Sequence, residues 1–225
     1  MPSPSADSSP PPPAAAVLVA VNRAHRPGGR GALARSGIDK RPVAGRVGVR
    51  GGDDPGLDGD LVADRKHHGG VDQALYLYAG EDADWWAAQL GRPITPGMFG
   101  ENLTTRGLDV TGAVIGEQWA IGTTRVEVSV PRIPCGTFQR FWDVPRLQKR
   151  FTEHGAPGAY LRVLEPGDVG AGDEIVPIAR PDHGVTIGEV FRALTGDRSL
   201  APRLLLAPQL PQEARDRARR WLGAD

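Results

Sequence analysis

Arg125-Val-Glu-Val-Ser-Val130 is the stretch of the chain that decides the fold. Its apolar residues alternate with polar ones, so Val126, Val128 and Val130 share one side of a half-buried β-strand. Gly122-Thr-Thr124 precedes it and predicts a hairpin turn from a strand at residues 118–121. Similar short runs, most of them bounded by Gly, Pro or Asp, predict further strands at residues 17–21, 46–50, 74–78, 160–164 and 174–178.

Two helices are expected among these strands, at residues 81–90 with Gly91 as the C-cap, and at residues 145–154 ended by Gly155. The strands do not alternate with helices in a βαβ rhythm. The sequence therefore predicts an α+β fold, mainly β, built on a closed or nearly closed barrel.

The texture of the sequence changes near Pro181. Thr186 and Glu189 form a capping-box pattern, and helices are expected at residues 186–194, 201–206 and 211–222. Six of the first 13 residues are prolines, which predicts a disordered tail. We therefore expect a Pro/Ser/Ala-rich tail at residues 1–14, a β-barrel domain at residues 15–180 and a small helical module at residues 185–225.

Composition excludes several classes of protein. The 225 residues include 27 Lys and Arg and 27 Asp and Glu, so the formal charge is zero. This argues against a general binder of nucleic acid or of membrane surfaces, which needs a basic field. No run approaches the about 20 apolar residues that span a membrane, and the start does not match a secretory signal. A single Cys excludes an intrachain disulfide framework and any Cys-cluster metal site. We expect a cytoplasmic protein.

Cys135 is the first candidate for chemistry. It follows the strongest strand in Pro131-Arg-Ile-Pro-Cys135, and the neighbouring Arg132 favours the thiolate over the thiol. A thiolate is a nucleophile or a soft metal ligand. The alternative is a buried, inert cysteine, which is common because Cys is among the most buried residue types.

Three weaker segments accompany it. Asp58 to Gly70 carries three Asp, Arg65 and the adjacent His67 and His68, of which one is expected to face a site; the alternative is a pair of surface histidines. Pro96 to Asn102 places an amide that either caps backbone groups in a tight turn or contacts a heterocycle. Ile38 to Val43 includes Lys40, and a solvated charged loop is the favoured interpretation there. Phosphate-loop, zinc-protease and serine-hydrolase motifs are absent from the sequence.

Taken together, these segments resemble the MOSC-domain family, in its bacterial YiiM-like group. The matching stretches, in order, are His68-Gly-Gly-Val-Asp-Gln-Ala-Leu75, Phe99-Gly-Glu-Asn-Leu-Thr-Thr-Arg-Gly-Leu108, Val128-Ser-Val-Pro-Arg-Ile-Pro-Cys135, Gly158-Ala-Tyr-Leu-Arg-Val-Leu164 and Gly170-Ala-Gly-Asp173. Their order and spacing fit over residues 15–180, and the helical tail resembles the three-helix module that follows the domain in this group.

The resemblance implies a MOSC-type β-barrel that binds the molybdenum cofactor, with Cys135 as the molybdenum ligand. Arg132 would keep the thiol ionised or bind the anionic cofactor. Lys40 and Arg65 would meet its phosphate or pterin, Asn102 would hydrogen-bond the pterin or the substrate, and His68 would donate a proton or orient an oxo ligand. The protein would orient the cofactor, which carries the electron chemistry.

The implied activity is the reduction of N-hydroxylated compounds, such as N-hydroxylated purine bases, in a detoxifying role. Since no second Cys or flavin motif is present, electrons would come from a separate donor protein or a non-specific reductant. Pyridoxal phosphate is not expected, because residues 1–14 cannot supply a desulfurase module. The alternative is a non-catalytic carrier of the cofactor or a sulfur relay through Cys135; a cysteine-dependent hydrolase is a remoter one. The oligomeric state stays open.

Overall fold

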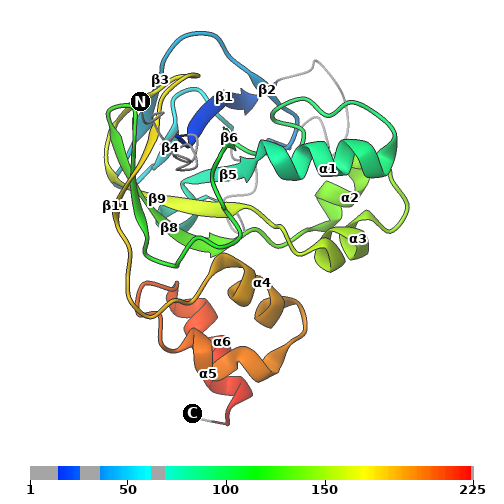
Figure 1. Ribbon diagram of the computed structural model, residues 1–225, viewed down its shortest axis with the longest axis vertical. Helices are drawn as coiled ribbons and strands as arrows, with labels where there is room; N and C mark the ends of the chain where they lie inside the picture. Colours follow the sequence, from blue (N-terminus) through cyan, green and yellow to red (C-terminus); the bar gives the residue numbers. More distant parts are fainter. Residues whose placement is uncertain (1–14, 26–35, 62–68, 224–225) are drawn as a thin grey trace, which may run out of the picture.

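The computed structural model describes residues 15–25, 36–61 and 69–223 (Figure 1). The strand predicted from the alternating stretch is β8, and it pairs antiparallel with β7 and with β9 in a mixed sheet of eight strands. In sheet order the strands are β11 (Ile175–Ala179), β7 (Gln118–Ile121), β8 (Thr124–Pro131), β9 (Ala159–Glu165), β5 (Leu75–Ala79), β6 (Leu103–Arg106), β1 (Val17–Ala24) and β2 (Lys40–Pro42). A second sheet contains β10 (Gly167–Val169), β3 (Val47–Arg50) and β4 (Gly56–Leu57).

β1, the second strand from one end of the large sheet, approaches β11 at the other end. The amide of Leu18 donates to Asp173 over 2.8 Å, Gly172 donates to Leu18 over 2.8 Å, and Ile175 donates to Ala16 over 2.8 Å. These bonds join β1 to the start of β11, but the two strands are not paired along their length. The α+β, mainly β class is thus observed, whereas a closed barrel stays a prediction.

Helices lie at one side of the large sheet and beyond one end of it (Figure 1). They are α1 (Gly80–Leu90), α2 (Gly136–Trp142), α3 (Leu147–His154), α4 (Ile187–Thr195), α5 (Ala201–Leu204) and α6 (Gln212–Trp221), with 3-10 turns at η1 (Val71–Gln73) and η2 (Arg198–Leu200). Gly91 ends α1 in the left-handed conformation, as predicted. The capping box of Thr186 and Glu189 at the start of α4 is also confirmed.

Several elements differ from the sequence prediction. The short strands β2, β4 and β10 were not expected, and β2 lies where a charged loop was favoured. β5, α1 and the parallel strand β6 form one βαβ unit, although no βαβ rhythm was expected. β6 was missed because Leu-Thr-Thr-Arg is short and mostly polar. α2 was missed as well, since it starts at Gly136 with no side-chain cap at Cys135, so the usual start signal is absent.

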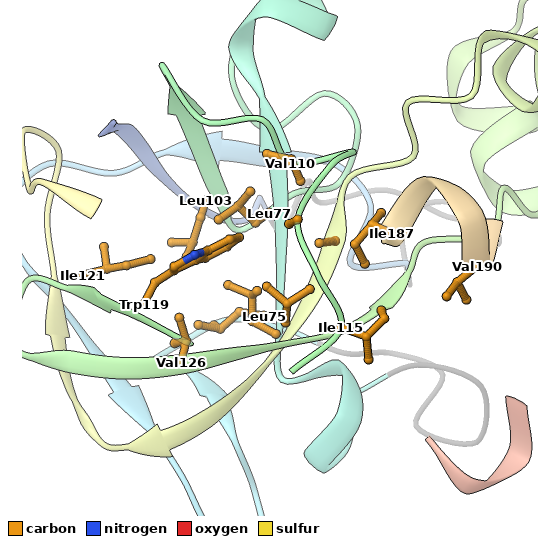
Figure 2. Packing of buried hydrophobic residues seen from close by; sticks show 14 of the residues in the cluster. Leu75, Leu77, Leu103, Val110, Ile115, Trp119, Ile121, Val126, Ile187 and Val190 are labelled. Atoms are coloured by element: carbon orange, nitrogen blue, oxygen red, sulfur yellow. The ribbon is translucent and has the colours of Figure 1, made fainter. Parts of the chain in front are cut away.

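The core continues from the sheet into the helical module. Trp119, Leu75 and Leu103 fill the space between the strands, and Ile187 and Val190 of α4 extend the same cluster past Ile115 (Figure 2). The division into a barrel domain and a helical module stays a prediction, but the buried side chains of the two parts form one continuous cluster.

An aromatic cluster fills the space between the sheet and α1 to α3. Its rings belong to Tyr76, Tyr78, Trp86, Phe99, Phe138, Trp142, Phe151 and Phe191. At its edge the His154 ring stacks on Trp85 with 3.7 Å between centroids, and Nε2 of His154 lies 3.9 Å from Oδ1 of Asp82. Burial lowers the pKa of His154. Burial, then the charges of Glu81 and Asp109, raise the pKa of Asp82 to about 6.

Asp82→Asn tests this buried carboxyl. The pKa of Asp82 in the folded protein, about 6, exceeds its unfolded value of about 3.9. The contribution of this carboxyl to the free energy of unfolding is therefore fully present below about pH 3.9, and it is lost as the pH rises through about 6. We expect Asp82→Asn to raise the free energy of unfolding by about 1 kcal/mol at pH 7.5, after allowance for partial exposure, and by almost nothing near pH 4. Urea denaturation at both pH values measures this. Asp84→Asn, at an exposed carboxylate, is the control; a destabilised Asp82→Asn at pH 7.5 would contradict the expectation.

Candidate functional site

β8 carries the chain to the candidate site. After Pro131 at the end of this strand, Arg132 is buried and Cys135 is half-buried. Cys135 has extended backbone angles, φ −119° and ψ 172°, and directly precedes α2. Pro134 favours this kind of extended approach by restricting the residue before it. The sequence prediction that a stiff turn presents the cysteine at a strand end is in keeping with this geometry.

Arg132 is a buried cation on aromatic rings. Its side chain is 6% exposed, and its guanidinium carbon lies 4.3 Å from the ring centre of Phe138 and 5.5 Å from that of Tyr76. Within the described part of the chain Arg132 forms no ion pair, and its Nη1 has no hydrogen-bond partner. Ring faces attract a cation but do not neutralise it. This position is therefore suited to an anion.

Tyr160 links Arg132 to Cys135. Burial raises the pKa of Tyr160, the positive charge of Arg132 lowers it, and negative charge on Cys135 raises it again. A hydrogen bond from Arg132 to the Tyr160 hydroxyl also lowers it. Both side chains therefore lie within electrostatic reach of one hydroxyl, in agreement with the sequence expectation that Arg132 and Cys135 act at one place.

Lys40 and Asn102, two of the predicted cofactor contacts, meet at Asp60. Oδ2 of Asp60 accepts from Nζ of Lys40 over 2.5 Å and from Nδ2 of Asn102 over 2.8 Å, while Oδ1 accepts from the amide of Ala24 over 2.7 Å. The side chains of Lys40 and Asp60 are 7% and 8% exposed, so Lys40 is not in a solvated loop. Asp60 was not singled out from the sequence, although it belongs to the acidic stretch noted there.

Asn102 also holds the backbone in place. Its Oδ1 accepts from the amide of Tyr76 over 3.1 Å. The side chain of Asn102 therefore caps a backbone group, which is one of the two roles that the sequence suggested for it. The Tyr76 ring in turn lies below the Arg132 guanidinium. One residue of β5 therefore connects the group formed by Lys40, Asp60 and Asn102 to the Arg132 position.

Glu101 is a buried carboxylate that the sequence analysis missed. It accepts from the amides of Gly97 and Phe99 over 2.5 and 3.0 Å, and from the hydroxyl of Thr104 over 2.8 Å. Burial raises the pKa of Glu101, and these three donors oppose the rise. Gly97 has φ 92°, and a Cβ there would clash with the backbone of Lys40. The signal available in the sequence was the Gly-Met-Phe-Gly-Glu pattern, in which the glycines permit such a turn.

A cleft of about 160 Å³ lies beside Asp60. It is lined by Arg50, Asp53, Asp54, Pro55, Gly56, Leu57, Asp60, Gly69, Gly70 and Ala74. Gly69 and Gly70, with φ 80° and 77°, let the backbone pass close to this space. Cys135 does not line this cleft. Arg65, His67 and His68 lie outside the described residues, so their predicted roles stay predictions.

Within the described ranges, no three His, Cys, Asp or Glu side chains gather into a metal-binding group. None of the helices there is long and apolar enough to cross a membrane.

The comparisons with known proteins assign the family. The MOSC domain model matches residues 64–176, half of the chain, so the chain belongs to the MOSC-domain family. Its resemblance to the YiiM-like group is confirmed by 33% identity over 138 residues to the protein YiiM of Escherichia coli (strain K12), which covers 60% of this chain and 61% of YiiM. The crystal structure of YiiM from Geobacillus stearothermophilus has a TM-score of 0.76 and 29% identity, and covers 92% of this chain and 99% of that chain.

Two further relatives extend the comparison. The uncharacterized protein YflK of Bacillus subtilis (strain 168) is 33% identical over 157 residues, or 70% of each chain. A protein named reductase from Gibberella moniliformis (strain M3125 / FGSC 7600) is 31% identical over 150 residues. This match covers 64% of the present chain and 26% of that protein, so the chain corresponds to about a quarter of that relative's length.

Proposed function

We propose that this protein binds the molybdenum cofactor through Cys135 and reduces N-hydroxylated compounds. One observation carries the proposal: the single cysteine shares the end of β8 with a buried arginine that has an unused N–H among the described residues. The reductase name of one relative supports the reaction type. The MOSC family supports the cofactor.

The residues present fit the group. A thiolate is a soft ligand, which suits molybdenum, and a buried cation without a carboxylate partner in the described chain suits an anionic cofactor. Cys135 would hold the metal and Arg132 would bind the anion. The family resemblance supplies the remaining roles. In this proposal the phosphate or pterin is contacted by Lys40, Arg65 and Asn102, and the proton donor is His68.

When bound, the cofactor supplies the two-electron redox chemistry. Reduction breaks the N–O bond of the substrate, consumes two electrons and two protons, and leaves an N–H group and water. The chain orients the reactants: the rings of Tyr76 and Phe138 fix the Arg132 guanidinium and keep water from it. His68 would hold the proton that reaches the departing oxygen. A separate protein would supply the electrons.

Cys135→Ser tests the ligand. Serine is close in size to cysteine, so folding should change little. It replaces a soft thiolate ligand by a hard hydroxyl that stays protonated, so metal ligation should be lost. With protein made in cells that synthesise the cofactor, and with dithionite as reductant, we expect reduction of an N-hydroxylated purine to fall to background. Molybdenum analysis and pterin fluorescence measure retention separately, and Cys135→Ala controls for any help from the serine hydroxyl.

Full activity in the Ser variant would refute Cys135 as the ligand. A different result would favour the carrier: loaded wild-type protein that shows no turnover with dithionite, yet delivers its cofactor to an apo-reductase. These two outcomes separate a wrong ligand from a wrong activity.

Arg132→Met tests the anion contact. Methionine is close in length and packs against aromatic rings, and removing a buried cation that lacks a counter-charge costs little stability. We expect the free energy of unfolding of cofactor-free protein to stay within about 1 kcal/mol of wild type or to rise. Cofactor content should fall by about tenfold or more. A strongly destabilised variant that keeps its cofactor would show that Arg132 is structural instead. Arg150→Met, at another cation near the ring of Trp86, is the matched control.

A further inference from the structure

Positive charge gathers on α2 and α3, beside Cys135. The whole sequence has equal numbers of basic and acidic residues, but residues 131–150 contain five basic side chains and one acidic one, Asp143. Two of the five lie against aromatic rings: Arg132 is buried on the rings of Tyr76 and Phe138, and Arg150 is half-buried beside Trp86. The exposed remainder consists of Arg140, Arg146 and Lys149.

Arg140 folds back toward Cys135. Its Nη1 lies 3.3 Å from the position that a Cβ of Gly136 would take, and its Nη2 lies 3.3 Å from the hydroxyl of Thr137. Both neighbours belong to the first turn of α2, directly after Cys135. The guanidinium therefore lies over the first turn of α2, the turn that directly follows Cys135 in the chain.

The first turn of α3 lies against the same loop. Nε2 of Gln148 donates to the carbonyl of Pro134 over 3.2 Å, and the backbone amide of Gln148 donates to Oε1 of Gln139 over 3.0 Å. These bonds hold the start of α3, where Arg146 is the N-cap and Lys149 lies in the first turn, against the segment that leads into Cys135. Among the described residues Arg140 and Arg146 form no ion pair, whereas Lys149 lies 3.5 Å from Glu153.

An apolar side chain completes this surface. Ile133 is 41% exposed and lies two residues before Cys135. An apolar centre with arginines around it is the usual composition of a transient protein interface, in which Arg is enriched and acidic residues are depleted. We name Ile133, Arg140, Arg146 and Lys149 the Cys135 face.

We propose that the Cys135 face docks a separate electron-donor protein whose own surface is acidic. This rests on the proposed function, since a reductase with one cofactor must receive two electrons from outside for each N–O bond broken. The two protons come from solvent through the protein. Complementary charge would speed the encounter and fix its orientation, and docking against the start of α2 would bring the donor to the Cys135 end of that helix.

The binding test uses cofactor-free full-length protein and a small acidic [2Fe–2S] ferredoxin as the probe. Arg140→Glu/Arg146→Glu reverses two charges on the face, and Arg192→Glu/Arg220→Glu makes the same change on α4 and α6. Calorimetry at about 20 mM and about 300 mM salt should show binding that weakens about tenfold or more with salt and with the first variant, but not with the second. Equal loss in both variants, no loss in either, or equally tight binding of single-stranded DNA would overturn the proposal.

The turnover test separates this surface from the function itself. With loaded protein, Arg140→Glu/Arg146→Glu should keep the wild-type rate with dithionite and lose about tenfold or more with the reduced ferredoxin at low salt. An unchanged ferredoxin-driven rate overturns the docking surface while the reductase stands. Wild-type protein that is inactive with dithionite overturns the reductase, and the binding test then still decides the surface.

Discussion

The hydrogen bonds of Asn102 are the constraint on which the rest of the site depends. Its amide donates to the carbonyl of Tyr76 over 2.7 Å, and its carbonyl accepts from the amide of Asn22 over 2.7 Å, so the residue directly before β6 ties β5 to β1. Its side chain reaches back to the amide of Tyr76 and forward to Asp60. Because the Tyr76 ring supports Arg132, the geometry around Cys135 depends on this junction.

Two buried cations near this junction, Lys40 and Arg132, differ in whether a carboxylate balances their charge. Lys40 has a carboxylate within 2.5 Å, so its charge is compensated inside the protein and the pair contributes a fixed position. Arg132 has aromatic rings and a tyrosine hydroxyl around it, and no carboxylate among the described residues. A buried charge left without a counter-charge is costly, and such costs concentrate where a protein binds something. This contrast favours Arg132 over Lys40 as the anion contact.

The sequence predicted those elements whose stabilising interactions lie between residues close together in the chain. The alternation in Arg125–Val130 and the capping box at Thr186 each require only neighbouring residues, and both are found as expected. β6 and α2 lack such signals, since one is short and polar and the other begins without a capping side chain. The role of Asp60 depends on partners 20 to 42 positions away, which spacing in the sequence does not reveal. The hydrogen-bond partners of Glu101 lie within four positions of it, so a local pattern of glycines was the available signal there.

The net charge counted from the sequence likewise does not show where charges lie on the surface. Equal numbers of acidic and basic residues correctly describe the net field far from the protein, where opposite charges cancel. Within about 10 Å, the screening length at moderate salt, only neighbouring charges matter. At that range Arg140 and Arg146 act without a carboxylate partner from the described chain, whereas Asp54 and Asp58 are both paired with Arg50. A chain with no net charge can therefore still present a local excess of positive charge, and the orientation of an acidic partner follows from that local excess rather than from the total.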